Sequence, residues 1–276
     1  MRILLLGGTG TLGRKFREIF IERKVDFFSP SRKELDLTQG KNIRIFLRQQ
    51  KFDLIVNCAG YSDTVSCEKN PKLARALNCD LVQELARSKI PLIHFSTDYV
   101  FAGKKEEQYF EDYSPAPVNF YGKSKAEGEQ VLQKNGGEFH VIRTSTLLGS
   151  KNDLLNKIVQ KYREKKEIFA SIDCLVQPTF ASSLAKGVYK YFIQKKQKSG
   201  FYHLTNCEAG ISTFVLAREI LTKLFGGNPQ INKVSFLQSS RDLYRPQYPT
   251  LLNSKLPPLP DFIGEIDQFL KTVILK

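Results

Sequence analysis

The stretch Leu6-Gly7-Gly8-Thr9-Gly10-Thr11-Leu12-Gly13 spaces three glycines, Gly7, Gly10 and Gly13, as G-x-x-G-x-x-G. It follows an apolar run at residues 3–6 and opens a helical pattern that extends to about residue 24. Glycines in such a turn let the backbone approach a pyrophosphate, and a helix N-terminus offers that group free N–H donors. A plain glycine turn could contain the same letters, but the position between a strand and a helix predicts dinucleotide binding.

Short apolar runs alternate with helical patterns through the first two thirds of the chain. The runs lie at residues 3–6, 26–28, 54–56, 92–95 and 139–142. This pattern predicts an α/β fold, a Rossmann-type doubly wound parallel sheet with helices on both faces. We expect residues 1–150 to form the NAD(P)-binding domain. Residues 151–276 are predicted to form a smaller C-terminal substrate-binding lobe, part of which crosses back to the first domain. The five prolines of residues 246–260 predict an ordered loop there.

Composition narrows the class of protein. The 276 residues are 41% apolar and 25% charged, enough to bury a core, and the net charge of +14 favours an anionic partner. The basic residues are scattered, without the aromatic platform that nucleic-acid binding uses, and no run approaches the roughly 20 apolar residues of a membrane span. The five cysteines form no C-x-x-C pair. We therefore expect free thiols, no metal site, no nucleic-acid or membrane partner, and a cytoplasmic location.

The end of the second apolar run bears on the choice of coenzyme. NAD-preferring sites usually place an acid there for the ribose 2′-hydroxyl, whereas an arginine accommodates a 2′-phosphate. Residues 29–33 contain no acid, and Arg32 lies among them. Arg32 therefore favours NADPH, while NADH with Arg32 as a solvated surface residue is the alternative.

A second group of candidate residues begins where the fourth apolar run ends. Ser96-Thr97-Asp98-Tyr99 follows that run, and the carboxyl ends of parallel strands border the crevice in which open α/β sheets bind ligands. Tyr121 and Lys125 share one face of a predicted helix, since they are four residues apart. Only this pair follows a strand end within reach of the dinucleotide. Two other Tyr-x-x-x-Lys pairs are interpreted as solvated faces: Tyr162/Lys166 and Tyr191/Lys195.

These residues suit hydride transfer to a ketone. The oxygen of the reduced carbonyl needs a proton, and a phenol has a pKa near 10, too high for ready transfer at neutral pH. An ammonium about 4 Å away would stabilise the phenolate by roughly 4 kcal/mol. We therefore expect Lys125 to lower the pKa of Tyr121, and Thr97 to hold the carbonyl oxygen. The three histidines lie in apolar patterns and are interpreted as core residues: His94, His140 and His203.

The motifs resemble the extended short-chain dehydrogenase/reductases, and more narrowly the dTDP-4-dehydrorhamnose reductase family. The resemblance extends over nearly the whole chain. Besides the glycine loop it includes Val56-Asn57-Cys58-Ala59-Gly60-Tyr61, Ser96-Thr97-Asp98-Tyr99-Val100-Phe101, Tyr121-Gly122-Lys123-Ser124-Lys125-Ala126-Glu127, Arg143-Thr144-Ser145 and Arg245-Pro246. The Ser-Thr-Asp-Tyr-Val-Phe run together with the late Arg-Pro is far more specific than the superfamily motifs.

The resemblance implies reduction of the 4-keto group of a nucleotide-diphosphate 6-deoxysugar with NADPH or NADH. Tyr121 would be the proton donor, and Lys125 would bind the nicotinamide ribose. The implied substrate-binding residues are Thr97, Asp98, Thr146 and Arg245. The implied cofactor-binding residues, besides Tyr121 and Lys125, are Gly7, Gly10, Thr11, Leu12, Gly13, Arg32, Asp36, Leu37, Ala59, Gly60 and Ser62. A homodimer is the assembly we expect if the chain associates with itself.

Some positions depart from the family pattern and keep other functions open. Thr146 stands where the family has a Trp, Val65 replaces an Asp, and residues 173–179 lose a Gln and a Gly of the family motif. Because these changes lie on the substrate side, the sequence predicts the chemistry better than the sugar. A nucleotide-sugar epimerase or dehydratase of the same superfamily is one alternative. The other is a non-catalytic NADP-binding regulatory subunit, like the similar beta subunit of methionine adenosyltransferase.

Overall fold

The computed structural model describes the whole chain except residues 106, 136, 207–208, 240–244 and 275–276. Its centre is a parallel sheet of six strands in the order β10-β5-β4-β3-β1-β2. The chain reverses its direction of travel across the sheet between β1 and β3, and such a switch point marks the ligand crevice of open α/β sheets. The six strands are β1 (Arg2–Leu6), β2 (Asp26–Phe28), β3 (Leu54–Asn57), β4 (Leu92–Thr97), β5 (Phe139–Thr144) and β10 (Gly200–His203).

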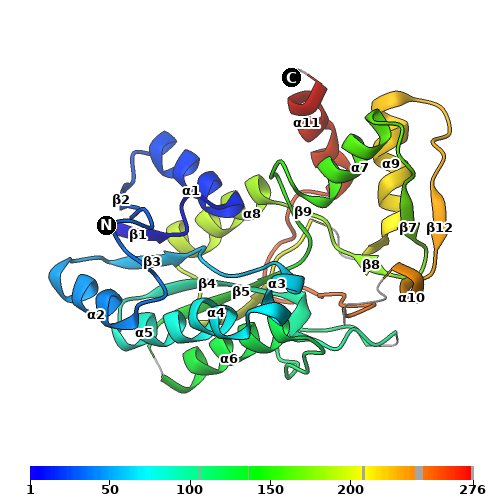
Figure 1. Ribbon diagram of the computed structural model, residues 1–276. Helices are drawn as coiled ribbons and strands as arrows, with labels where there is room; N and C mark the ends of the chain where they lie inside the picture. Colours follow the sequence, from blue (N-terminus) through cyan, green and yellow to red (C-terminus); the bar gives the residue numbers. More distant parts are fainter. Residues whose placement is uncertain (106, 136, 207–208, 240–244, 275–276) are drawn as a thin grey trace.

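Helices cover both faces of this sheet, as Figure 1 shows. Because successive residues of a strand point to opposite faces, Ile3 and Leu5 pack with α1, while Leu4 and Leu6 pack with α5. The predicted Rossmann-type doubly wound parallel sheet is therefore confirmed. One face carries α1 (Thr11–Glu22), α8 (Ala181–Val188) and the π-helix η3 (Tyr189–Gln194), and the other carries α2 (Gly40–Gln49), α5 (Leu81–Arg87) and α6 (Phe120–Asn135).

The helical region before β4 contains a π-helical turn. It runs through α4 (Pro71–Arg75), the π-helix η1 (Ala76–Asp80) and α5, and the short α3 (Thr64–Lys69) precedes it. The side chain of Asn78 in this turn accepts a hydrogen bond from the backbone N–H of Tyr61 and donates one to the Ser124 hydroxyl, at 2.8 and 2.9 Å. Asn78 thereby ties the segment that follows β3 to α6.

The last third of the chain forms a further core at one end of the sheet (Figure 1). Residues 181–203 are the exception, since α8, η3 and β10 pack with the central sheet. The strand pairs are β6 (Leu147–Leu148) with β9 (Thr179–Phe180), β8 (Leu175–Val176) with β11 (Ile211–Ser212), and β7 (Phe169–Ser171) with β12 (Asn232–Val234). The helices are α7 (Leu154–Arg163), α9 (Thr213–Phe225), α10 (Phe236–Ser239) and α11 (Phe262–Ile274).

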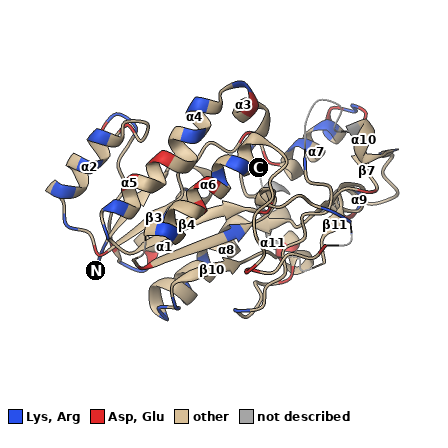
Figure 2. Ribbon diagram, turned by 90° about the horizontal axis from the view of Figure 1, so that it is seen from below, with Lys and Arg blue, Asp and Glu red and all other residues tan. Residues whose placement is uncertain are grey.

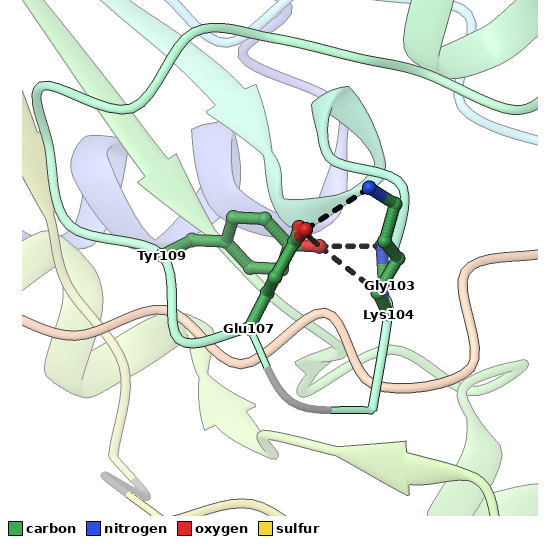
Figure 3. A network of polar contacts seen from close by, with 4 residues as sticks. All are labelled: Gly103, Lys104, Glu107 and Tyr109. Atoms are coloured by element: carbon green, nitrogen blue, oxygen red, sulfur yellow. Dashed lines mark hydrogen bonds and ion pairs between the residues drawn. The ribbon is translucent and has the colours of Figure 1, made fainter.

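The loop between β4 and α6 is held by one buried tyrosine. The Tyr109 hydroxyl accepts hydrogen bonds from the backbone N–H groups of Gly103 and Lys104, at 3.0 and 3.1 Å, and donates to the Glu107 carboxylate at 2.8 Å. Figure 3 shows this network, in which Lys104 also reaches Glu107 at 3.0 Å. The Tyr109 ring stacks on Phe101 at 4.4 Å between centroids. These contacts order the loop next to the carboxyl end of β4.

The proline-rich residues 246–260 pack along that loop, as the sequence predicted for an ordered segment. Leu251 forms a β-bridge with Tyr109. The buried Glu111 carboxylate accepts a hydrogen bond from the Ser254 hydroxyl at 2.7 Å. The segment after residue 245 is therefore tied to the loop beside β4.

Charged residues are distributed over many helices rather than gathered on one. Figure 2 shows Lys and Arg on α2, α4, α6 and α8, with acidic residues among them. Of the helices in the described part of the chain, none combines the length and the hydrophobicity needed to cross a bilayer.

Candidate active site

The glycine loop lies at the switch point of the sheet. Gly7 has φ +73°, and a Cβ at this position would lie 2.6 Å from the backbone nitrogen of Ala59, so only glycine fits between the loop and the segment after β3. The N-terminus of α1 has no side-chain cap from Gly10 and no acid in its first turn. Its N–H groups therefore suit an anion such as a pyrophosphate. Thr11 is half-buried at this end, and Leu12 and Gly13 are buried behind it.

The residues after β2 border the same loop. Ser29 lies against Gly8, because its hydroxyl fills the space that a Cβ on Gly8 would need. Arg32 is exposed. Hydrogen bonds from the Thr38 N–H and hydroxyl lower the pKa of Asp36, and the charge of Arg32 lowers it further. Arg32 and Asp36 therefore lie close together beyond β2, near the position where Rossmann folds bind the ribose of the dinucleotide.

A buried carboxylate organises the end of β4. The Thr97 hydroxyl donates to one oxygen of Asp98 at 2.8 Å, and the Ser145 hydroxyl donates to the other at 2.5 Å. The backbone N–H of Tyr99 donates to the Thr97 hydroxyl at 3.2 Å. Burial raises the pKa of Asp98 to about 6, although both hydroxyl hydrogen bonds oppose the rise. Asp98 thus fixes the orientation of Thr97 at the carboxyl end of the strand.

Tyr121 lies beside Thr97 at the start of α6. Its ring packs edge-on against the Tyr99 ring, with 5.7 Å between centroids. The next residue, Gly122, leaves room for the backbone carbonyl of Tyr99, which a Cβ there would overlap. Burial raises the pKa of Tyr121 well above its usual value, and the hydrogen bond with Thr97 opposes that rise. The sequence prediction that these two residues share one site is consistent with this contact.

Lys125 lies one turn further along α6 and is directed at β4. Its side chain is buried, its Nζ donates to the backbone carbonyl of Phe95 at 2.5 Å, and Nζ lies 3.2 Å from Nε2 of His94. Burial lowers the pKa of Lys125 to about 8. Burial of the phenol is the largest effect on the pKa of Tyr121, so that pKa is raised overall rather than lowered. A lowering contribution from Lys125 stays a prediction.

Two of the remaining predicted residues lie close to this group. A Cβ on Gly60 would come within 4.0 Å of Lys125 Nζ, so Gly60 borders the lysine. Burial raises the pKa of Tyr99, and the charge of Arg245 opposes that rise. Exposed Arg245 therefore lies near the Tyr99 ring, which packs on Tyr121. The others are half-buried or exposed in the same loops: Leu37, Ala59, Ser62 and Thr146.

The other Tyr-x-x-x-Lys pairs lie away from this site. Half-buried Tyr162 of α7 packs on Phe225 at 4.6 Å between ring centroids. Tyr191 is buried in the core with α8, so its interpretation as part of a solvated face is wrong, because its ring packs under the helix. No cluster of metal-ligating side chains occurs among the described residues. Four described cysteines are free thiols, and the fifth, Cys207, lies outside the described residues.

Several residues of the site were not assigned a role from the sequence. Ser145 belongs to a quoted motif, but its bond to Asp98 spans 47 residues of chain. The role of Asn78 could not be predicted, because the sequence of the π-helical turn that orients its side chain looks like that of an ordinary helix. Ser29 contacts the glycine loop only because β1 and β2 are neighbours in the sheet.

The family described as RmlD substrate binding domain matches residues 1–271. The chain belongs to this family. The predicted resemblance to the dTDP-4-dehydrorhamnose reductases is confirmed by this match and by the relatives that follow.

Similar proteins extend over most of the chain. A probable dTDP-4,6-dihydroxy-2-methyloxan-3-one 4-ketoreductase of Streptomyces antibioticus is 29% identical over 258 residues, which are 91% of this chain and 86% of the relative. A dTDP-4-dehydrorhamnose reductase of Salmonella typhimurium is 30% identical over 215 residues, 74% of this chain and 72% of the relative. The crystal structure of dTDP-4-dehydrorhamnose reductase from Bacillus anthracis in complex with NADP has a TM-score of 0.89 at 25% identity and covers 98% of this chain and 99% of its own.

Proposed function

We propose that this protein is an NADPH-dependent reductase of the 4-keto group of a nucleotide-diphosphate 6-deoxysugar. The observation that supports this most directly is the contact of Tyr121 with Thr97 at the carboxyl end of β4, beside a glycine loop suited to a pyrophosphate. The family match and the reductases among the similar proteins support the same reaction and substrate class.

The chain's own residues supply the proton. When bound, NADPH provides the hydride that adds to the carbonyl carbon of the sugar. The Tyr121 hydroxyl gives its proton to the carbonyl oxygen, so that an alcohol is formed. Since a hydroxyl has one hydrogen, Thr97 must turn its hydrogen away from Asp98 to donate to that oxygen as well. Asp98 would hold Thr97 in place until the substrate binds, and Lys125 would hold a ribose hydroxyl of the coenzyme.

The coenzyme would lie across the switch point. The glycine loop with Thr11 and Leu12 would bind the pyrophosphate, and Arg32 would bind the 2′-phosphate of NADPH. The remaining proposed lining residues are Asp36, Leu37, Ala59, Gly60 and Ser62. The NADP in the similar Bacillus anthracis reductase supports this choice of coenzyme.

The proposed substrate site lies between the two parts of the chain. We assign coenzyme binding to residues 1–150 and most substrate contacts to residues 151–276, with residues 181–203 crossing back to the first part. Thr146 and Arg245 would border the sugar and its diphosphate. The free thiols among the described cysteines favour a cytoplasmic location. That the chain forms a homodimer stays a prediction.

A panel of nucleotide-linked sugars tests the proposal. The purified protein is mixed with NADPH and nucleotide-diphosphate 4-keto-6-deoxyhexoses, and the loss of reduced-nicotinamide absorbance is followed. We expect stoichiometric oxidation of NADPH with at least one sugar. Turnover without net loss of that absorbance would indicate an epimerase or dehydratase instead. Inactivity across the panel, with co-purification of a partner enzyme, would indicate a regulatory subunit.

A further inference from the structure

A chain of buried polar groups lies behind Lys125. It begins at Asn57, the last residue of β3, and passes through His94 in the middle of β4. Asn57 Nδ2 lies 3.1 Å from His94 Nδ1, and His94 Nε2 lies 3.2 Å from Lys125 Nζ. Asn57 and His94 are fully buried, and Lys125 is 5% exposed. Because water is excluded, each polar hydrogen of these three side chains must find its acceptor among the neighbouring protein groups.

The backbone sets the direction of these hydrogen bonds. The N–H of Ala59 can only donate, and it donates to Asn57 Oδ1 at 3.1 Å. The amide nitrogen of Asn57 therefore faces His94 and donates to Nδ1, which must carry a lone pair. Burial lowers the pKa of His94 well below its usual value, so the ring is neutral. Its one hydrogen is consequently on Nε2.

That hydrogen faces the lysine. An Nε2–H group makes a hydrogen bond only with a lone pair, and an ammonium has none. A neutral Lys125 amine can accept from His94, donate to the Phe95 carbonyl at 2.5 Å, and keep one N–H for another partner. A protonated Lys125 would turn an N–H toward the N–H of His94, and this contact is repulsive.

A carboxylate near Lys125 acts in the opposite direction. Glu129, one turn further along α6, favours the ammonium, whereas the thiol of Cys58, just after β3, has a pKa raised by burial and stays uncharged. The Glu129 carboxylate already accepts hydrogen bonds from Arg143 at 2.8 and 3.0 Å, which offsets its charge. Burial is the larger effect on Lys125, and His94 is the group that meets its nitrogen directly.

We propose that Asn57 and His94 are positioning residues that lower the proton affinity of the Lys125 amine by directing the His94 Nε2–H at its nitrogen. The proposal depends on the proposed function only for its consequence, since Lys125 is there the amine one helical turn from the proton donor. The hydrogen bonds from Asn57 through His94 to Lys125, called the relay below, are a property of the folded chain. Their test therefore needs neither coenzyme nor substrate.

The substitution Asn57→Asp reverses the relay with almost no change in shape. The new carboxylate still accepts from the Ala59 N–H, but it can only accept from His94 as well. The histidine hydrogen must then move to Nδ1, which leaves a lone pair on Nε2 for an ammonium at Lys125. We expect the proton affinity of Lys125 to rise tenfold or more.

The readout is the lysine ¹³Cε NMR signal of the labelled protein, titrated without ligands from about pH 6 to pH 11, across the usual lysine pKa near 10.4. The Lys125 signal is identified by its loss in Lys125→Met. His140→Phe is the matched control, because His140 is an equally buried histidine of the adjacent strand whose Nε2 bonds to the Gln197 carbonyl. We expect this control to leave the Lys125 titration unchanged.

A His94→Phe background separates the relay from the added charge. Without the imidazole, Asn57→Asp can act on Lys125 only through space, so we expect a much smaller rise in proton affinity than in the wild-type background. Equal rises in the two backgrounds would overturn the relay. An unchanged Lys125 titration in Asn57→Asp alone would also overturn it, and this result stands even if His94→Phe does not fold.

Discussion

Thr97 and Asp98 are adjacent in the sequence and share a buried hydrogen bond of 2.8 Å at the end of β4. The other Asp98 oxygen accepts from Ser145 at 2.5 Å, so both oxygens of this carboxylate serve to position hydroxyl groups. Thr97 in turn contacts Tyr121. The geometry of the proposed proton donor therefore depends on a carboxylate that itself lies away from solvent.

Replacing Asp98 by Asn should change how stability depends on pH. Burial raises the pKa of Asp98 to about 6, whereas an unfolded Asp titrates near 4. Between these values the folded protein binds more protons than the unfolded chain, so Asp98 makes wild-type stability fall as pH rises. From about pH 4 to pH 7, Asp98→Asn should therefore gain roughly 2 kcal/mol of unfolding free energy relative to wild type.

Urea denaturation followed by circular dichroism at several pH values measures this difference. Asp112→Asn, at an exposed position, is the control and should follow the wild-type profile. Parallel wild-type and Asp98→Asn profiles would show that Asp98 is not the source of the pH dependence.

Gly7→Ala should weaken NADPH binding. Its Cβ would lie 2.6 Å from the Ala59 nitrogen, at a φ of +73° that L side chains rarely adopt. The strain displaces the loop from the pyrophosphate, and a cost of about 1.4 kcal/mol already corresponds to a tenfold weaker Kd. Fluorescence titration with NADPH gives the Kd. Gly226→Ala is a matched control, with φ +71° and open space at its Cβ, and it should bind normally. Equal binding by Gly7→Ala and wild type would contradict a pyrophosphate at this loop.

Arg32→Ala should change coenzyme preference. If Arg32 binds the 2′-phosphate, its loss removes a charge-assisted hydrogen bond of about 1.5 kcal/mol, so the ratio of kcat/KM for NADPH to that for NADH should fall about tenfold. Lys33→Ala removes a neighbouring exposed charge and should leave the ratio near the wild-type value. A fall of the same size in both variants would point to general electrostatic attraction instead.

The central sheet was predictable because each of its first five strands contains a short, mostly apolar run between helical patterns. Pairs such as β6 with β9 escaped prediction, since each strand has two residues and shows no periodicity. α11 also escaped, because it follows prolines that indicated only a loop.

Within the site, residue types and spacing indicated Thr97, Tyr121 and Lys125, but not the directions of their hydrogen bonds. Those directions depend on partners that are distant in the chain, such as His94, which meets Lys125 across 31 residues. The net rise in the pKa of Tyr121 was not foreseen, because the extent of burial cannot be read from the spacing.

The most direct test of the proposed reductase is Tyr121→Phe, which removes the hydroxyl and keeps the ring that packs on Tyr99. With a keto-sugar that the wild-type protein reduces, we predict that kcat for NADPH oxidation falls about 10³-fold, the usual contribution of a positioned acid, while the Kd for NADPH is unchanged. Wild-type turnover by Tyr121→Phe would contradict the assignment of Tyr121 as the proton donor.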